Sequence, residues 1–184
     1  MKFGIGQSLS RIEDDNLIIG KGSYTDDHFV GQGYHIAFLR SDYAHAKIIN
    51  LNLDDAKKID GVKLVASQID LEKSKVGNIH CSQFVKNRDN TEIPKITKTP
   101  MANDFVRNVG EIICFVVAET KQIALDALEH INVEYKPLNA VCDVYEAVKD
   151  DAPHIYDCFS NNIVFDWETG LSEETDKIFN FALR

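Results

Sequence analysis

The segment EIICFVVAETKQIALDALEHINVEYKPL (residues 111–138) predicts three successive elements of secondary structure. Residues 111–119 form a nearly continuous apolar run, which is the pattern of a strand buried on both faces. Thr120 is a residue type that caps helices, and the apolar residues after it recur at helical spacing. The chain then returns as a strand over 132–138, which Pro137 closes because proline has no N–H for the ladder. We expect this strand–helix–strand unit to supply the core residues Ile112, Ile113, Phe115, Val116, Ile123, Ala127, Leu128 and Val133.

A second unit of the same kind is predicted nearer the N-terminus. Aromatic and β-branched residues indicate strands at 34–39, 46–53 and 62–67. A short helix over 54–59 is expected to begin at Asp54, a good N-cap, and to end at Gly61. Within 46–53 the alternation puts the apolar bias on the face of Lys47, Ile49, Leu51 and Leu53. Two such units around a mixed sheet predict an α+β or α/β domain, with right-handed crossovers where strands run parallel.

Three stretches lie outside these units. Residues 73–104 are polar and weakly periodic, and because so long a gap is uncommon inside a compact domain, we expect a surface excursion with a short strand or two. Residues 150–170 indicate a connector, in which only NIVFDW (162–167) alternates. A helix is expected to begin at Ser172, because two glutamates follow it.

The composition is that of an ordinary globular domain. Of the 184 residues, 44% are hydrophobic and 27% are charged, and this length predicts one domain plus appendages. Acidic residues outnumber basic ones by 29 to 20, which gives a net charge of −9. A protein that binds a phosphate backbone needs a basic stripe to displace counterions. We therefore expect no nucleic-acid partner.

We expect a cytoplasmic protein without a membrane segment. The N-terminal stretch MKFGIGQSLSRIEDD has no apolar centre of the kind found in signal peptides. No apolar run approaches the ~20 residues that a membrane helix needs. The cysteines show neither metal-ligand spacing nor a C-x-x-C pair, so we expect them all to be reduced thiols. They are Cys81, Cys114, Cys142 and Cys158.

Periodicity and spacing alone predict no active site. None of the six histidines pairs with another histidine or a carboxylate at i,i+4 on a predicted helix, so no metal site is expected. They are His28, His35, His45, His80, His130 and His154. Asp26 and Asp27 beside His28 could form an acid/base pair, but adjacent acidic residues in a glycine-flanked turn are more typical of a solvated turn.

The glycines do not form a phosphate-binding loop. Gly4 and Gly6 have no strand before them, and Gly20 and Gly22 have no helix after them, although such a loop needs both. Gly110 lies between two strand-like pieces, where it indicates a turn or a bulge.

The stretch RSDYAHAKI (40–48) allows two interpretations. Arg40, Ser41 and His45 could form a polar constellation with chemistry, although Ser41 has no evident base and acid partner. Alternatively, the stretch is a tight corner between two strands, in which Ala44 and Ala46 permit close backbone approach. In that corner Arg40 would satisfy loop carbonyls, and His45 would be a hydrogen-bonded turn histidine.

Four linked motifs occur in order along most of the chain: GQSLSRIEDDNLIIGKGSYTDD (6–27), LRSDYAHAKI (39–48), TPMANDFVRNVGEIICFVVAET (99–120) and ALDALEHINVEYKPLNAV (124–141). Together they resemble the N-terminal part of the molybdenum-binding large subunit of the xanthine dehydrogenase, aldehyde oxidase and carbon monoxide dehydrogenase family. Asn108 departs from the aromatic residue common after "VR" in that family, which affects a packing contact.

The resemblance implies an α/β hammerhead domain over 18–140. Residues 1–17 would be an N-terminal extension, and 141–184 a connector and the truncated start of the molybdenum-binding region. In that family the RS-x-x-AHA segment is a structural corner with no known catalytic residue. The resemblance therefore favours the corner interpretation of residues 40–48.

The resemblance also implies that the molybdopterin cofactor and the catalytic glutamate belong to downstream domains. We expect this chain to hold no catalytic, cofactor-binding or metal-ligating residue. Its expected role is structural, in the assembly of a molybdenum hydroxylase, with the remaining molybdenum domains or other subunits as partners. The alternatives are a stand-alone interaction or scaffold module that kept the fold and lost the enzyme, and an unrelated small-ligand binder that uses the sheet edge.

The last part of the chain is too apolar for a solvated linker. We expect its large apolar residues to be buried by folding back, by a partner or, without a partner, by self-association. These residues are Ile155, Tyr156, Phe159, Ile163, Phe165, Trp167, Ile178 and Phe179.

Overall fold

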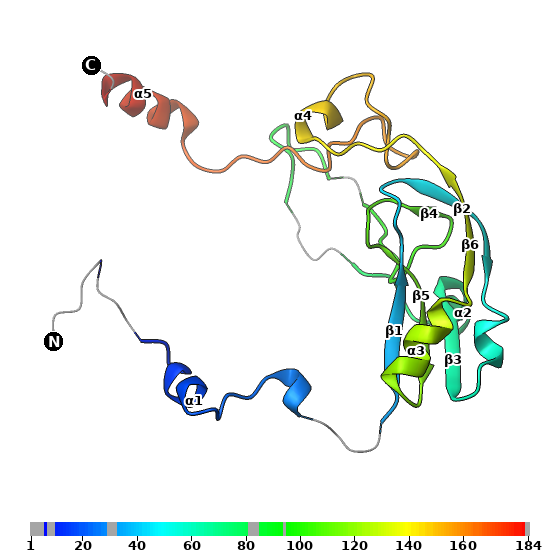
Figure 1. Cartoon of the computed structure of the whole chain (residues 1–184). Coiled ribbons are helices and arrows are strands. Elements are labelled where there is room, and N and C mark those ends of the chain that lie inside the picture. Colours follow the sequence, from blue (N-terminus) through cyan, green and yellow to red (C-terminus); the bar gives the residue numbers. More distant parts are fainter. Residues whose placement is uncertain (1–5, 7–9, 29–32, 81–84, 94, 183–184) are drawn as a thin grey trace. The chain divides into compact units, whose positions relative to one another are not determined.

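The structure, a computed structural model, describes residues 6, 10–28, 33–80, 85–93 and 95–182 (Figure 1). The contacts divide the chain into two units, residues 1–33 and 34–184, and each is described by itself. Gly4 and Cys81, which were considered above, lie outside the described residues.

The N-terminal unit contains two short helices that the sequence patterns did not predict. They are α1 (Asp14–Ile18) and the 3₁₀ helix η1 (Thr25–Asp27). The Asp14 carboxylate closes the start of α1, because it accepts hydrogen bonds from the backbone N–H of Arg11 at 3.1 Å and from its Nε at 3.0 Å. None of the α1 residues is buried, so this helix depends on local polar contacts.

The second unit is built on two three-stranded sheets. The first has the order β1-β5-β3 and consists of β1 (His35–Arg40), β5 (Ile112–Ala118) and β3 (Val62–Ser67). The second has the order β4-β2-β6 and consists of β4 (Phe105–Val106), β2 (Ala46–Asn52) and β6 (Asn132–Pro137). The strands predicted at 34–39, 46–53, 62–67, 111–119 and 132–138 are all confirmed.

The α+β class is confirmed, but the sheet is not the mixed one that we expected. All four strand pairings are antiparallel. The reason is that each strand–helix–strand unit crosses from one sheet to the other: β2 and β3 lie in different sheets, and so do β5 and β6. The two strands of a unit therefore never become parallel neighbours, and no crossover of the predicted kind arises.

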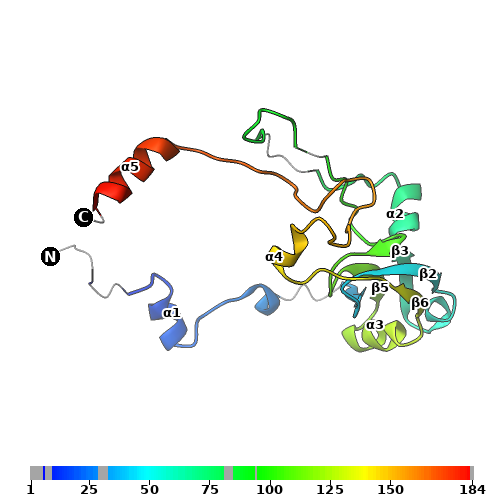
Figure 2. The ribbon, with the colours of Figure 1, turned by 90° about the horizontal axis from the view of Figure 1, so that it is seen from above.

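Helix α3 (Lys121–Leu128) covers one face of the β1-β5-β3 sheet. Thr120 caps it as predicted, since its hydroxyl accepts a hydrogen bond from Ile123 N at 3.2 Å. Figure 2 shows α3 and α2 on opposite sides of the strands. Gly61 is required beneath α3, because its φ is +84° and a Cβ there would lie 2.8 Å from Ile123 Cδ1.

Two clusters of buried side chains form the core. The first, between α3 and the β1-β5-β3 sheet, consists of Ala37, Leu53, Ala56, Val65, Cys114, Val116, Ala118, Ala124 and Ala127. The second, where the two sheets meet, consists of Ala46, Ala102, Val106 and Ile113. Of the eight predicted core residues, Ile113, Val116 and Ala127 are fully buried, and the other five are half-buried.

The predicted inner face of β2 is correct for Leu51 and Leu53 but wrong for Lys47 and Ile49, because the strand contains a bulge. The register against β6 shifts between Ile48 and Asn50, so that Ile49 is an extra residue and is 50% exposed. A bulge reverses the alternation at the point where it occurs. Consequently Ala46 and Ile48 face the core before the bulge, and Leu51 and Leu53 face it afterwards.

The helical segments between the strands differ from the prediction. Residues 54–59 contain only the 3₁₀ helix η2 (Ala56–Lys58), and its N-cap is Asp55 rather than Asp54. Helix α2 (Gln68–Lys73) was not predicted. It follows β3 directly. Its first turn is closed by the carboxylate of Asp70, which accepts hydrogen bonds from the N–H of Ser67 at 2.9 Å and from the Ser67 hydroxyl at 3.0 Å.

The C-terminal part contains α4 (Val144–Ala147) and α5 (Ser172–Ala182). The start of α5 at Ser172 is confirmed, whereas α4 was not predicted. The residues of NIVFDW form no strand. No helix in the described part of the chain is long and apolar enough to cross a membrane.

Candidate functional site

The corner at residues 40–45 uses its polar groups to hold the backbone. Arg40 donates from Nη1 to the carbonyl of Gly110 at 2.8 Å, as predicted. Ser41 is 2% exposed and pairs with the facing loop, since its N–H donates to the Glu111 carbonyl at 2.9 Å and its carbonyl accepts from Gly110 N at 2.7 Å. Its hydroxyl also accepts from Tyr43 N at 3.0 Å. The same hydroxyl donates to the carbonyl of Tyr43 at 3.0 Å, so both of its contacts are to the backbone of the corner.

His45 is the hydrogen-bonded turn histidine that the corner interpretation predicts. It is 8% exposed, and its Nδ1 lies 2.9 Å from the carbonyl oxygen of Asn139. A carbonyl only accepts, so Nδ1 carries the proton. The backbone carbonyl of His45 accepts from Leu138 N at 3.0 Å. The histidine thus ties the start of β2 to the residues that follow β6.

The turn at Asp27 and His28 also has local partners. The Asp27 carboxylate accepts from Tyr24 N at 2.8 Å, and His28 Nε2 lies 2.8 Å from the hydroxyl of Ser23. Both side chains are exposed. Asp27 therefore caps η1 and forms no pair with His28 in the hydrogen bonds of the described residues.

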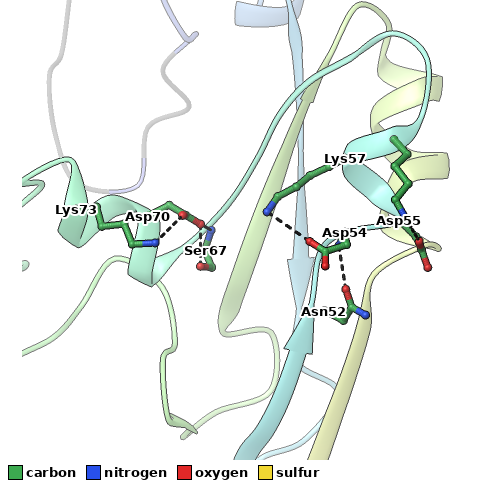
Figure 3. A network of polar contacts seen from close by, with 8 residues as sticks. Asn52, Asp54, Asp55, Lys57, Ser67, Asp70 and Lys73 are labelled. Carbon is green, nitrogen blue, oxygen red and sulfur yellow. Dashed lines mark hydrogen bonds and ion pairs between the residues drawn. The ribbon is translucent and has the colours of Figure 1, made fainter.

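A polar groove of about 410 Å³ lies between the end of β2 and the start of α2. Figure 3 shows its charged side chains in pairs: Lys57 lies 3.9 Å from Asp54, and Lys73 lies 3.8 Å from Asp70. The backbone N–H of Ser67 holds the pKa of Asp70 below its usual value. These groups shape the turn and cap α2, and each cation already has a carboxylate partner.

Arg107 fastens the connector to the domain. Its guanidinium lies over the ring of Tyr156, 4.5 Å from the centroid, and over Phe105 at 5.3 Å. Its Nε donates to the carbonyl of Ile155 at 3.2 Å. Arginine stacks on aromatic faces while its N–H groups remain available for hydrogen bonds, and this residue does both. The motif "VR" at 106–107 gave no sign of this role, because the partners lie far along the chain.

Asn162 shapes the connector itself. Its side-chain oxygen accepts from Ile155 N at 3.0 Å, and its Nδ2 donates to the carbonyls of Pro153 at 3.0 Å and Ala147 at 3.1 Å. One amide side chain therefore closes the loop from α4 to residue 162. Sequence reasoning missed this residue, since an asparagine in a loop is common.

A second contact fastens a later part of the connector. Lys86 and Glu92 form an antiparallel bridge, and the turn between them presents Arg88, whose Nη2 lies 2.7 Å from Asp166 Oδ2. The backbones also pair, since Arg88 N donates to the Asp166 carbonyl at 2.8 Å. Over its described residues, the surface excursion predicted at 73–104 is confirmed except at Met101 and Ala102, which are buried. Its turn contacts the segment NIVFDW through Asp166.

The predicted fate of the apolar tail is confirmed in part. Ile155, Tyr156 and Phe159 are half-buried against the domain. The remaining five stay exposed, between 44% for Ile163 and 69% for Ile178. Self-association of the chain stays a prediction.

The described residues contain no cluster of metal ligands. They include no group of three or more histidine, cysteine or carboxylate side chains close enough to hold a metal ion. Every buried polar side-chain atom among them already has a hydrogen-bond partner. Cys114 is buried in the core, and burial raises the pKa of its thiol to about 12.

Comparisons with known proteins agree with the fold. Residues 19–139 match the family model of the aldehyde oxidase and xanthine dehydrogenase a/b hammerhead domain. The carbon monoxide dehydrogenase large chain of Afipia carboxidovorans is 30% identical over 96% of this chain and 22% of its own length. The nicotine 6-hydroxylase large subunit of Paenarthrobacter nicotinovorans is 32% identical over 79% of this chain and 17% of its own.

Among solved structures, quinoline 2-oxidoreductase from Pseudomonas putida 86 superposes with a TM-score of 0.71 at 34% identity. The match covers 89% of this chain and 20% of that one. The chain therefore spans about a fifth of the length of the relatives that it matches.

Proposed function

Because the chain belongs to the aldehyde oxidase and xanthine dehydrogenase family through its a/b hammerhead domain, we propose that it serves as the hammerhead part of a molybdenum hydroxylase large subunit. Its role in this proposal is structural: it packs against the molybdenum-binding domains and helps to wall the substrate channel. The hammerhead would span about residues 18–140, preceded by an extension and followed by a connector at 141–184.

The observation that carries the proposal is the extent of the family match. The family model covers residues 19–139, and about four-fifths of the length of the Afipia carboxidovorans large chain and of quinoline 2-oxidoreductase lies outside the matched part. The catalytic machinery of this family belongs, in our proposal, to that additional length. The chain itself would contribute no catalytic residue and no ligand to the cofactor.

The contacts of the corner support a structural role. Arg40, Ser41 and His45, the residues that could have formed a site, each bond to backbone groups of neighbouring loops. Such bonds rigidify the junction between the two sheets. A rigid domain that carries a fastened connector is suited to position the chain that follows it.

The proposal is tested by co-expression in a host that makes the molybdenum cofactor. The partner is the part of the Afipia carboxidovorans large chain that lies outside the match, and the tagged protein is the present chain. We expect the partner to co-elute with the tag and molybdenum to be detected in that fraction by mass spectrometry. The tagged chain expressed alone should elute without molybdenum.

The relative's own matched segment, tagged in the same way, is the positive control. If that segment retains the partner and the present chain does not, the hammerhead role is wrong. A stand-alone interaction module would then be the better account. A cytoplasmic location stays a prediction that cell fractionation can check.

A further inference from the structure

One face of the β1-β5-β3 sheet is apolar and open. The pairings place two rows of side chains across this face: Ile36, Val117 and Leu64 in one row, and Phe38, Phe115 and Ala66 in the other. The opposite face, which carries Ala37, Val116 and Val65, is the one that packs in the core cluster with α3. We call the five large residues Ile36, Phe38, Leu64, Phe115 and Val117 the open face.

Other parts of the domain cover this face of the sheet along only part of β5. Ile113, on the same side of the strand, is 0% exposed in the second core cluster, and Ala66 is 3% exposed. Further along, Ile36 is 50%, Phe38 40% and Leu64 49% exposed. Phe115 and Val117 remain half-buried between them. The open face is therefore a continuation of a packed face and not a set of scattered exposed residues.

The sequence of β5 matches a strand that is covered on both sides. All seven residues of Ile112–Ala118 are apolar, a composition typical of strands buried on both faces, whereas strands with one solvated face alternate with polar residues. The rows of the open face contain no charged side chain. Arg40 lies at their edge, and its guanidinium is 5.8 Å from the centroid of Phe38.

We infer that the open face is the surface on which the rest of the large subunit docks, through an uncharged aliphatic and aromatic patch of its own. This inference rests on the proposed function, which supplies the partner. Five residues are far fewer than the roughly 20–30 per side that a stable free complex buries. A patch of this size favours an occupant held nearby by other contacts, such as the segments that follow the connector, over a second copy of this chain.

The test compares three half-exposed aliphatic residues in strands. Ile36→Lys and Leu64→Lys place a charge on the open face. Ile49→Lys is the matched control, because Ile49 is also 50% exposed but lies on the bulge of β2. Each variant is titrated against the unmatched part of the Afipia carboxidovorans large chain. Leu64→Thr, which keeps strand propensity, is a second variant in case a lysine impairs folding.

We expect Ile36→Lys and Leu64→Lys each to weaken binding at least tenfold, and Ile49→Lys to change it less than twofold. If the wild-type chain binds and the two open-face variants bind as well as Ile49→Lys, the inference is wrong while the proposed function stands. If the wild-type chain fails to bind where the relative's own segment succeeds, both are wrong. A dimer of the chain alone that Leu64→Lys dissociates in light scattering would assign the face to a second copy and overturn the inference.

Discussion

The guanidinium of Arg107 lies 4.5 Å from the centre of the Tyr156 ring and joins the loop before β5 to the connector after α4. Tyr156 is thereby held in place together with Ile155, whose carbonyl accepts from Arg107 Nε. In the proposed function, this contact would help to set the direction in which the connector leaves the domain toward its partner.

We predict that Arg107→Lys loosens the connector. Lysine keeps the charge but loses both the planar stack and the Nε donor. Limited proteolysis should then cut several-fold faster between residues 148 and 162, and a double-mutant cycle with Tyr156→Leu should give a coupling of ~0.5–1 kcal/mol. Arg88→Lys is the control, since Arg88 pairs with Asp166 and Glu168. This substitution should loosen only the segment around residues 166–168. Equal cleavage in wild type and Arg107→Lys would contradict the prediction.

Ile113→Ala should be strongly destabilising. The side chain is 0% exposed where the two sheets meet, so its truncation should lower the free energy of unfolding by ~2–5 kcal/mol. Leu125→Ala is the matched control on α3, because Leu125 is 43% exposed. This substitution should change the free energy of unfolding by less than ~0.5 kcal/mol. Urea denaturation measures both. Similar losses in the two variants would mean that the assigned faces are wrong.

His45→Ala should reduce stability by ~1–3 kcal/mol, because the carbonyl of Asn139 then loses its donor in a partly buried site. His45→Asn offers an amide N–H in its place and should recover part of the loss. Arg40→Ala should cost less, since Arg40 is exposed and water can replace it. Any turnover by the purified chain that disappears in His45→Ala would show that the corner carries chemistry after all.

Cys114 should resist thiol reagents in the folded chain, whereas Cys142 and Cys158 should react. Cys114 is buried and the other two are exposed, and the thiolate rather than the thiol is the reactive form. Iodoacetamide followed by peptide mass spectrometry distinguishes the three positions. Denaturation before labelling is the control and should make all three equally reactive. Rapid labelling of Cys114 in the native chain would contradict its place in the core.

The same thiol predicts a dependence of stability on alkaline pH. Burial raises the pKa of Cys114 from 9.0 to about 12, so the folded state holds its proton more tightly than the unfolded state does. Its contribution to stability is complete below about pH 9 and is lost as the pH rises toward 12, by at most ~1.4 kcal/mol per pH unit. Wild type and Cys114→Ala should therefore differ by a constant amount up to pH 8 and converge above pH 9. Parallel curves over this range would exclude the effect.

Local patterns were sufficient for β5 and α3. The apolar run of β5, the Thr120 cap and the helical stripe after it predicted their structures because each depends on neighbours within a few residues. The S-x-x-D pattern at Ser67 and Asp70 belongs to the same class and could have predicted α2. The Ile49 bulge could not be read in this way, since it exists only relative to the register of β6.

The sequence by itself determined the strands other than β4, the helix α3 and the resemblance to the hammerhead family, because these depend on spacing along the chain. Only the tertiary structure decided how the elements combine. In it, the two strands of each unit lie in different sheets, Arg107 contacts Tyr156 and one face of the β1-β5-β3 sheet is exposed. The physical reason is that these features arise between residues far apart in the chain, where burial and pairing depend on the whole fold and not on local preference.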